Sequence, residues 1–383
     1  MGTDKQFSKF VPERLAEARE IRGMTTKELA EAVGVSQQAI SKFEKPDKTD
    51  PGYDTLEKLS STLHVPVTFF YKQINPVANE SIVFFRSKSA ATVKSKKVHA
   101  NKLKWIREVS SYLDHILGFP DVNIPIFTKN TKSFIPTDFN DIEEIALKVR
   151  ENWGLGNGPI SNLVLLLEKN GAVVARSPFS NYDIDACSIW LENERPLILL
   201  SNDKTAARSR FDIAHELGHL VLHSHLSVTE FNKKENFKLI EKEANYFASA
   251  FLLPSPSFGR EIFSTSIDYL ISLKKRWKVS INAMAYRAKQ LRIFSDYQYI
   301  YIKNKLAQQN WLKNEPLDNE IPFENPSLLK QAVEAVIEND IKTKQDFISE
   351  IGLLREEIEA ISGLDPGYLL SKEGAKIFNF KLK

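Results

Sequence analysis

The chain opens on short amphipathic stretches in which apolar side chains recur every three or four residues, the spacing of one helix face. The helices that this spacing predicts cover residues 15–22, 27–33, 37–43 and 53–63. Thr26 and Ser36 stand directly before the second and third of them, where a hydroxyl can cap free amides, and Gly34 lies in the turn between the two. Two helices joined by so short a turn predict a helix-turn-helix.

The second helix of this pair has one apolar and one polar face. Val35 and Ile40 are expected to pack inward. Glutamines at the exposed start of the helix suit an adenine edge, while hydroxyl and lysine side chains further along suit phosphates. The predicted contacts to double-stranded DNA are Thr26, Ser36, Gln37, Gln38, Ser41 and Lys42. A module that only dimerises or holds another protein is the alternative.

A basic stretch follows this helical unit. Between Arg86 and Arg107 the chain has eight basic residues and no acidic one. The stretch is either a solvated helix face or linker, or an arm that follows DNA phosphates. Apolar residues at helical spacing over 103–116 predict a connecting helix after it.

Two histidines stand four residues apart in the apolar run 213–223, so they project from one face of a helix. His215 and His219 can therefore bind one metal ion, and Zn²⁺ suits neutral imidazole. Glu216 between them points toward the same site as a general base. The alternative is a buried helix with two hydrogen-bonded histidines.

A catalytic zinc requires a third protein ligand and one open position. In the predicted helix 239–253, Glu241 shares a face with small and apolar residues, where an unpaired charge would be costly, and Asn245 lies one turn further on. Glu243 lies on another face and is the alternative ligand. His225 has the spacing of the third metzincin histidine, but Leu222 stands where that motif has glycine.

These residues carry a resemblance. Residues 215–223 read His-Glu-Leu-Gly-His-Leu-Val-Leu-His, and residues 241–254 read Glu-Lys-Glu-Ala-Asn-Tyr-Phe-Ala-Ser-Ala-Phe-Leu-Leu-Pro. Together they resemble the ImmA/IrrE family of zinc metallopeptidases, whose similar members cleave DNA-binding repressors. Residues 29–44, with Gly-Val-Ser-Gln-Gln-Ala-Ile-Ser-Lys-Phe at their centre, resemble the XRE/Cro family of repressors.

The ligand set and the resemblance together predict an enzyme with one Zn²⁺ per chain, held by His215, His219 and Glu241. Glu216 would take a proton from the attacking water and pass it to the leaving amine. The resemblance implies a protein substrate, an XRE-type repressor being the expected one. We expect Arg210 to pair with a nearby acid such as Asp212 or Glu216, or to pack at the start of the helix, and in either case to lie outside the catalytic set. His223 and Cys187 are expected to be buried residues outside the ligand set.

Apolar runs at 172–175, 186–190 and 197–200 predict strands beside the helices 142–153 and 159–169. In hydrolases of this type an edge strand can hold the peptide, so residues 187–190 or 197–200 are candidates. Helices are expected after residue 254, and residues 296–302 are expected to form a strand.

The predicted fold is mainly α, with an all-α N-terminal helix-turn-helix domain, an α+β zincin-like catalytic domain and a helical C-terminal region. The predicted divisions are a DNA-binding domain at 11–72, a basic linker with a connecting helix at 73–137, a metallopeptidase domain at 138–260 and a C-terminal region at 261–383.

The amino-acid composition limits the number of domains and the cellular compartment that we expect. A chain of 383 residues with 42% hydrophobic and 26% charged residues can form two or three globular domains. One cysteine excludes an internal disulfide, and the absence of a long apolar run predicts a cytoplasmic protein without a membrane span. A non-cleaving regulator that senses a ligand or partner, and a pure protein-interaction module, are the alternative functions; a homodimer is also considered.

Overall fold

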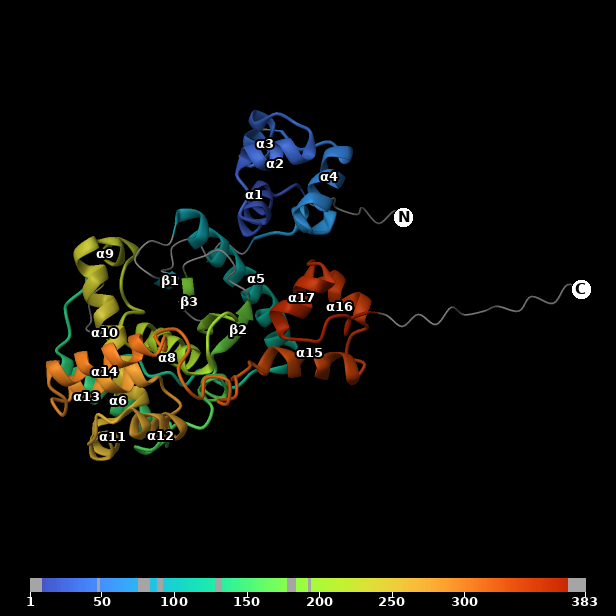
Figure 1. Ribbon diagram of the computed structural model, residues 1–383. Coiled ribbons are helices and arrows are strands. Elements are labelled where there is room, and N and C mark those ends of the chain that lie inside the picture. Colours follow the sequence, from blue (N-terminus) through green and yellow to red (C-terminus); the bar gives the residue numbers. More distant parts are fainter. Residues whose placement is uncertain are drawn as a thin grey trace, which may run out of the picture. The chain divides into compact units, whose positions relative to one another are not determined.

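The computed structural model describes residues 9–46, 49–74, 83–87, 92–127, 133–177, 184–191 and 194–370. They form two compact units (Figure 1). One unit comprises the chain up to Ile74 together with Glu108–Leu117 and the chain from Leu329; the other comprises Asn75–Arg107 and Gly118–Leu328. The fold is mainly helical with one small sheet, as the sequence predicts. The predicted domain boundaries stay a prediction.

The first unit begins with the predicted helices. They are α1 (Pro12–Ile21), α2 (Thr26–Val33), α3 (Gln37–Phe43) and α4 (Tyr53–Leu63), followed by the 3-10 helix η1 (Val67–Tyr71). The expected cap of α2 was wrong by one residue: Thr25 is the N-cap, because its hydroxyl accepts from the Glu28 amide while the Glu28 carboxylate accepts from the Thr25 amide. Ser36 caps α3 as predicted.

The remaining helices of this unit come from later in the chain. They are the end of α5 (Val93–Leu117), most of α15 (Leu328–Glu338), α16 (Lys344–Ile351) and α17 (Arg355–Ser362). The buried Arg14 pairs with Glu17 on its own helix and with Glu108 on α5, at 2.6 Å for the latter. Arg22 pairs with Glu357 on the acidic helix α17 at 2.6 Å.

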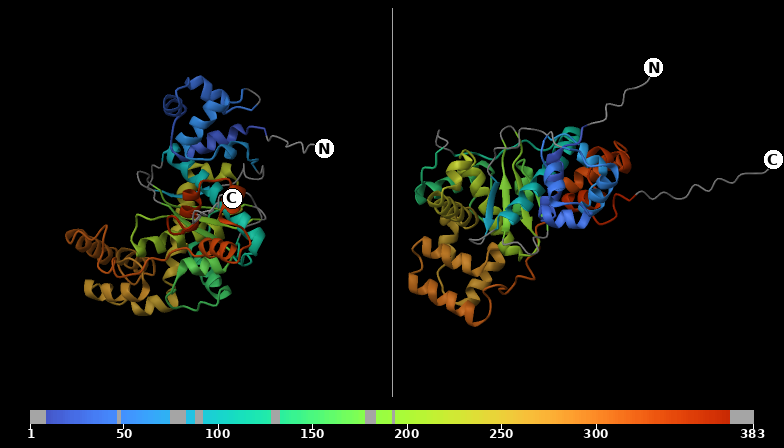
Figure 2. Two further views of the ribbon diagram at one scale, coloured as in Figure 1. Left: turned by 90° about the vertical axis from the view of Figure 1, so that its right-hand side faces the viewer. Right: turned by 90° about the horizontal axis from the view of Figure 1, so that it is seen from above.

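The second unit contains a four-stranded sheet in the order β1, β3, β4, β2 (Figure 2). Its strands are β1 (Val83–Ser87), β2 (Val173–Ser177), β3 (Ile184–Ile189) and β4 (Leu197–Ser201). β3 runs antiparallel to both of its neighbours, whereas β2 and β4 are parallel. Three strands lie where the apolar runs predict them, and β1 was not predicted.

Helices enclose this sheet and carry the candidate site. They are α6 (Phe139–Asn152), α7 (Leu163–Lys169), α8 (Ala206–Leu222), α9 (Val228–Asn232), α10 (Lys234–Leu252), α11 (Ser255–Glu261), α12 (Ile267–Trp277), α13 (Ile281–Gln290) and α14 (Asp296–Gln308). α8 and α10 pack closely at Gly218, where an added Cβ would lie 3.2 Å from the Ala244 Cα atom and 3.1 Å from the Phe247 ring. The glycine therefore lets the two helices approach.

Residues 296–302 belong to helix α14, so the predicted strand there is wrong. Tyr297, Tyr299 and Tyr301 alternate in sequence like one strand face, but Tyr297 and Tyr301 are exposed. A capping box between Ser295 and Gln298 instead starts a helix. No helix among the described residues is both long and apolar enough to cross a membrane.

Candidate metal centre

His215 and His219 of α8 and Glu241 of α10 bring their ligand atoms within 4.8 Å of one another. The two histidine Nε2 atoms are 3.0 Å apart. Glu241 Oε2 lies 3.5 Å from His215 Nε2, and Glu241 Oε1 lies 3.2 Å from His219 Nε2. Because zinc ligands bind at about 2.0–2.2 Å, the corners of a tetrahedral site lie roughly 3.4 Å apart. These three groups therefore have the spacing that one zinc ion requires.

Asn245, one turn after Glu241, orients His215. The His215 Nδ1 atom lies 3.2 Å from Asn245 Oδ1, and Asn245 Nδ2 donates to the Glu241 carbonyl oxygen at 2.7 Å. Since Oδ1 can only accept, His215 carries its proton on Nδ1. The lone pair on Nε2 then points toward His219 and Glu241. Asn245 thus contacts a histidine ligand as well as the helix backbone next to Glu241.

His219 is oriented by a relay that ends on Glu243. His219 Nδ1 lies 3.1 Å from His223 Nδ1, and His223 Nε2 lies 3.0 Å from Glu243 Oε2. Glu243 also accepts from the Thr137 amide at 2.8 Å. The carboxylate makes His223 Nε2 the donor, so His223 Nδ1 accepts from His219 Nδ1.

Both candidate histidine ligands therefore present a lone pair at Nε2 to the same point, beside a carboxylate. Burial lowers the pKa of His223 to about 4, so the His223 ring stays neutral near neutral pH. His215 and His219 are fully buried. Two lone pairs and a negative charge facing one another at about 3 Å repel unless a cation lies between them. The donor set thus fits Zn²⁺.

The three candidates for the third zinc ligand, Glu241, Glu243 and His225, lie in different places. Glu241 lies beside His215 and His219, whereas the Glu243 carboxylate is hydrogen-bonded to His223 and to the Thr137 amide. His225 lines a separate cavity of about 260 Å³ together with His223 and Glu243. α8 ends at Leu222 even without a glycine there, but His225 still lies outside the ligand cluster. The helix phase that favours Glu241 in the sequence agrees with this arrangement.

Glu216 is held by a residue that the sequence does not single out. Ser188 of β3 donates its hydroxyl to Glu216 Oε2 at 2.5 Å, and both residues are fully buried. Neighbouring Cys187 is a buried thiol whose pKa is raised well above its usual value, first by burial and then by the charge of Glu216. Cys187 is therefore a poor nucleophile, as expected.

A large groove reaches the site from the α13 and α14 side. Its volume is about 1580 Å³, and Glu241 and Asn245 lie in its wall. Stacked rings of Phe139 and Tyr246, with centroids 4.5 Å apart, form another part of that wall. The groove is large enough for several residues of a peptide, since ligand pockets of about 300–1,000 Å³ hold drug-sized molecules.

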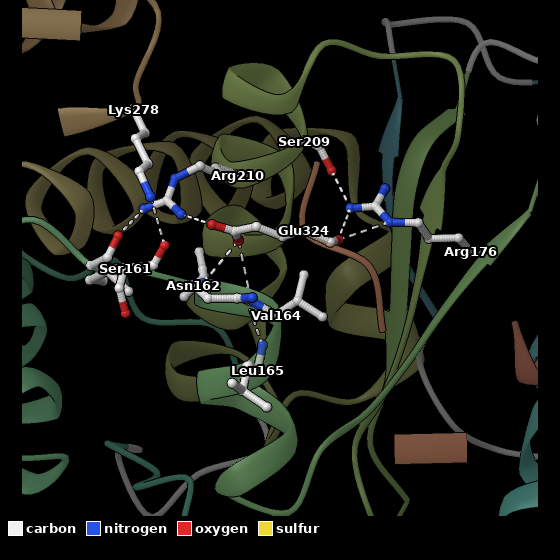
Figure 3. Close-up of polar contacts among 11 residues, drawn as sticks. Ser161, Asn162, Val164, Leu165, Arg176, Ser209, Arg210, Lys278 and Glu324 are labelled. Atoms are coloured by element: carbon white, nitrogen blue, oxygen red, sulfur yellow. Dashed lines mark hydrogen bonds and ion pairs between the residues drawn. The ribbon is translucent and has the colours of Figure 1, made fainter. Parts of the chain in front are cut away.

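Arg210 pairs with an acidic residue, as expected, although that residue is Glu324 and neither Asp212 nor Glu216. Its guanidinium contacts the Glu324 carboxylate and donates to the Ile160 carbonyl at 2.8 Å (Figure 3). The same carboxylate accepts from the Leu163 amide at the start of α7 at 2.9 Å. Arg210 therefore fixes the segment around Glu324 to the start of α7 and to α8.

The six predicted DNA-contacting residues lie on α2, α3 and the turn between them. Ser36, Gln37, Gln38 and Lys42 are exposed, and Thr26 and Ser41 are half-buried. Gln37 donates to the Thr26 hydroxyl at 3.1 Å, which fixes its side chain at the entrance of α3. Ile40 is fully buried, as the apolar pattern predicts.

Comparison with known families gave two matches. Residues 167–289, which include both candidate ligand helices, match the family model of the IrrE N-terminal-like domain, a peptidase family. Residues 15–70 match the Helix-turn-helix family model. No curated protein matches the chain. The two family matches confirm the resemblances seen in the sequence, and each of them covers less than half of the chain.

Proposed function

We propose that this protein is a zinc-dependent endopeptidase fused to a domain that binds double-stranded DNA, and that it cleaves a regulatory protein such as an XRE-type repressor. The two Nε2 lone pairs that converge on Glu241 carry the proposal for zinc. The family match at 167–289 supports a peptidase, and the match at 15–70 supports DNA binding. The proposed boundaries are those predicted from the sequence.

In this proposal His215, His219 and Glu241 hold one zinc ion. Bound zinc would activate a water molecule and polarise the scissile carbonyl group. Glu216 accepts the proton of the water at its carboxylate and later delivers it to the leaving amine. Ser188 keeps that carboxylate in place, since its hydroxyl donates to Oε2 at 2.5 Å. The groove that reaches Glu241 would receive part of the substrate.

On the DNA side, α3 is proposed as the recognition helix. Gln37 and Gln38 would contact base edges, and the hydroxyls of Thr26, Ser36 and Ser41 together with Lys42 would contact phosphates. The exposure of Gln38 and Lys42 supports this assignment. Substitution of Lys42 by methionine should weaken binding to all sequences, whereas Gln38→Ala should reduce discrimination between operators.

The decisive experiment measures bound zinc and cleavage on the same samples. Wild type, Glu216→Gln, His215→Ala and Glu235→Gln are purified, their zinc is determined by elemental analysis, and each is incubated with XRE-type repressors of the host. We expect one zinc ion per chain in both wild type and Glu216→Gln, but repressor cleavage by wild type and not by Glu216→Gln. His215→Ala should lose both the zinc ion and the cleavage activity. Glu235 is an exposed carboxylate of α10, so its variant should behave as wild type.

Zinc-loaded wild type that cuts none of the repressors, yet shifts promoter DNA, would contradict the peptidase proposal. The non-cleaving regulator would then be the better interpretation. Cleavage that persists in Glu216→Gln would contradict the role of Glu216 alone.

A further inference from the structure

Strand β1 fills one edge of the strand that carries Ser188. β1 pairs antiparallel with β3, and β4 pairs with the other edge of β3. The paired residues are Val83 with Ile189, Phe84 with Ser188, Phe85 with Cys187, Arg86 with Ala186 and Ser87 with Ile184. β1 lies outside residues 167–289, the part of the chain that matches the peptidase family model. Figure 2 shows the strands of this sheet side by side.

The register places a β1 side chain at the metal centre. Phe84 lies opposite Ser188, whose hydroxyl holds Glu216. The Phe84 ring stacks on the His219 ring, with centroids 4.8 Å apart and planes within 8°. Phe84 is buried, and Phe231 packs edge-on against it at 5.2 Å. β1 thus brings an aromatic side chain onto a candidate zinc ligand.

An extended peptide binds a sheet by adding to an edge whose amides and carbonyls are free. A peptide cut beside Glu216 must run close to Ser188, and the β3 edge opposite β4 is the backbone that can hold it there. We propose that this edge of β3 is the peptide-binding surface of the enzyme and that β1 occupies it as a tethered inhibitor. This inference rests on the proposed peptidase function.

The pairing of β1 with β3 is short and irregular, which suits a strand that can be displaced. The strand has five residues, and its register shifts between Arg86 and Ser87. Its advantage over a free peptide comes from the covalent connection, because a tethered segment competes at an effective concentration of about millimolar. A peptide or protein supplied at micromolar concentration therefore pairs with β3 only after β1 has left the edge.

The single cysteine of the chain provides a test of this occupancy. Phe85 pairs with Cys187 in the register, so Phe85→Cys places two cysteines on neighbouring strands at a separation that a disulfide can bridge. Oxidation locks β1 onto β3, and reduction removes this lock in the same sample, so that a peptide can again compete with β1. Phe85→Cys combined with Cys187→Ala cannot form the bridge and is the control for the substitution.

The probe is a fluorescein-labelled peptide with the sequence of residues 81–87, Ser-Ile-Val-Phe-Phe-Arg-Ser, and its binding is followed by fluorescence anisotropy. The proteins are zinc-loaded and carry Glu216→Gln, so that binding is read without turnover. We expect at least tenfold weaker binding to the oxidised than to the reduced double-cysteine protein. Phe84→Ala, which removes the contact with His219, should bind the peptide at least tenfold more tightly than its parent.

Phe237 provides a matched control for the loss of an aromatic ring. It packs against the same small cluster as Phe84, through Phe231, but lies on α10. Phe237→Ala should leave peptide binding within twofold of the parent. Equal binding by oxidised and reduced protein would overturn the inference, because peptides would then bind away from this edge of β3.

Cleavage assays separate this inference from the proposed function. Wild-type Glu216 is restored, and repressor cleavage is compared before and after oxidation. Cleavage that is unaffected by the disulfide retains the peptidase and overturns the inhibitory role of β1. Peptide binding that the disulfide blocks, in a protein that never cleaves, retains the binding surface and contradicts the peptidase. Cleavage of the chain within residues 83–87 would also overturn the inference, since β1 would then be a substrate.

Discussion

Replacing His223 by phenylalanine should weaken zinc binding without removing a ligand. The change deletes the nitrogen that accepts the His219 Nδ1 proton, while a ring of similar size remains beside Phe134. In the zinc-bound state His219 Nε2 must face the metal, so its Nδ1–H would stay buried and lose this acceptor. Loss of one such bond costs about 1–3 kcal/mol, which corresponds to roughly 5- to 150-fold weaker binding.

Competition with a fluorescent zinc chelator near neutral pH measures this effect. His225→Phe is the matched control, because His225 lines the same small cavity and lies outside the candidate ligand cluster. We expect the control to bind zinc within twofold of wild type. If His223→Phe also stays within twofold, the relay does not orient His219, and the assignment of the lone pair to Nε2 loses its basis on that side of the site.

The partner of His223 provides a second check on the same relay. Glu243 joins His223 to the Thr137 amide, so Glu243→Gln should weaken zinc binding on its own. In the double variant with His223→Phe, the Glu243 change should add little further loss, because the relay is already broken. Fully additive losses would mean that the two residues act separately.

Three further results are expected, each measured by urea-induced unfolding. Gly218→Ala should cost up to about 2 kcal/mol, because the strain of a Cβ 3.2 Å from the α10 backbone outweighs the roughly 1 kcal/mol that alanine gains over glycine inside a helix, and a raised midpoint would refute this packing. Thr25→Ala should cost about 1 kcal/mol and Thr26→Ala clearly less, since the hydroxyl of Thr25 caps α2. Burial lowers the pKa of His99 from 6.5 to about 4, so the unfolded chain takes up the proton first, and stability present above pH 6.5 falls by about 2 kcal/mol on going to pH 5. His99→Gln should remove that part of the pH dependence.

Local signals were enough to predict most helices. α3 and α4 begin and end at the predicted residues, because serine or glycine precedes them and their apolar spacing is regular. The failure at α14 is also local: alternating tyrosines imitate a strand, whereas the capping box of Ser295 and Gln298 starts a helix. β1 differs, since its five residues, which overlap only the start of the basic stretch, form a strand through pairing with β3, a segment about a hundred residues away in sequence.

The candidate ligands could be chosen from the sequence because one turn of helix fixes which side chains share a face. His215 with His219, and Glu241 rather than Glu243, follow from that spacing. The roles of Asn245 and His223 depend on which acceptor each histidine nitrogen meets, and those acceptors come from another helix. Periodicity within one helix carries no information about such contacts.

Ser188 shows how strongly the site depends on strand register. Side chains alternate between the two faces of β3, so Ser188 meets Glu216 on the α8 side while its neighbour Cys187 lies on the other face. A slip of one residue would place a thiol beside the Glu216 carboxylate and turn the serine away. Pairing of β3 with both β1 and β4 opposes that slip. Displacement of β1 would therefore have to leave the β4 pairing intact, so that Ser188 keeps its hold on Glu216 while a peptide takes the vacated edge.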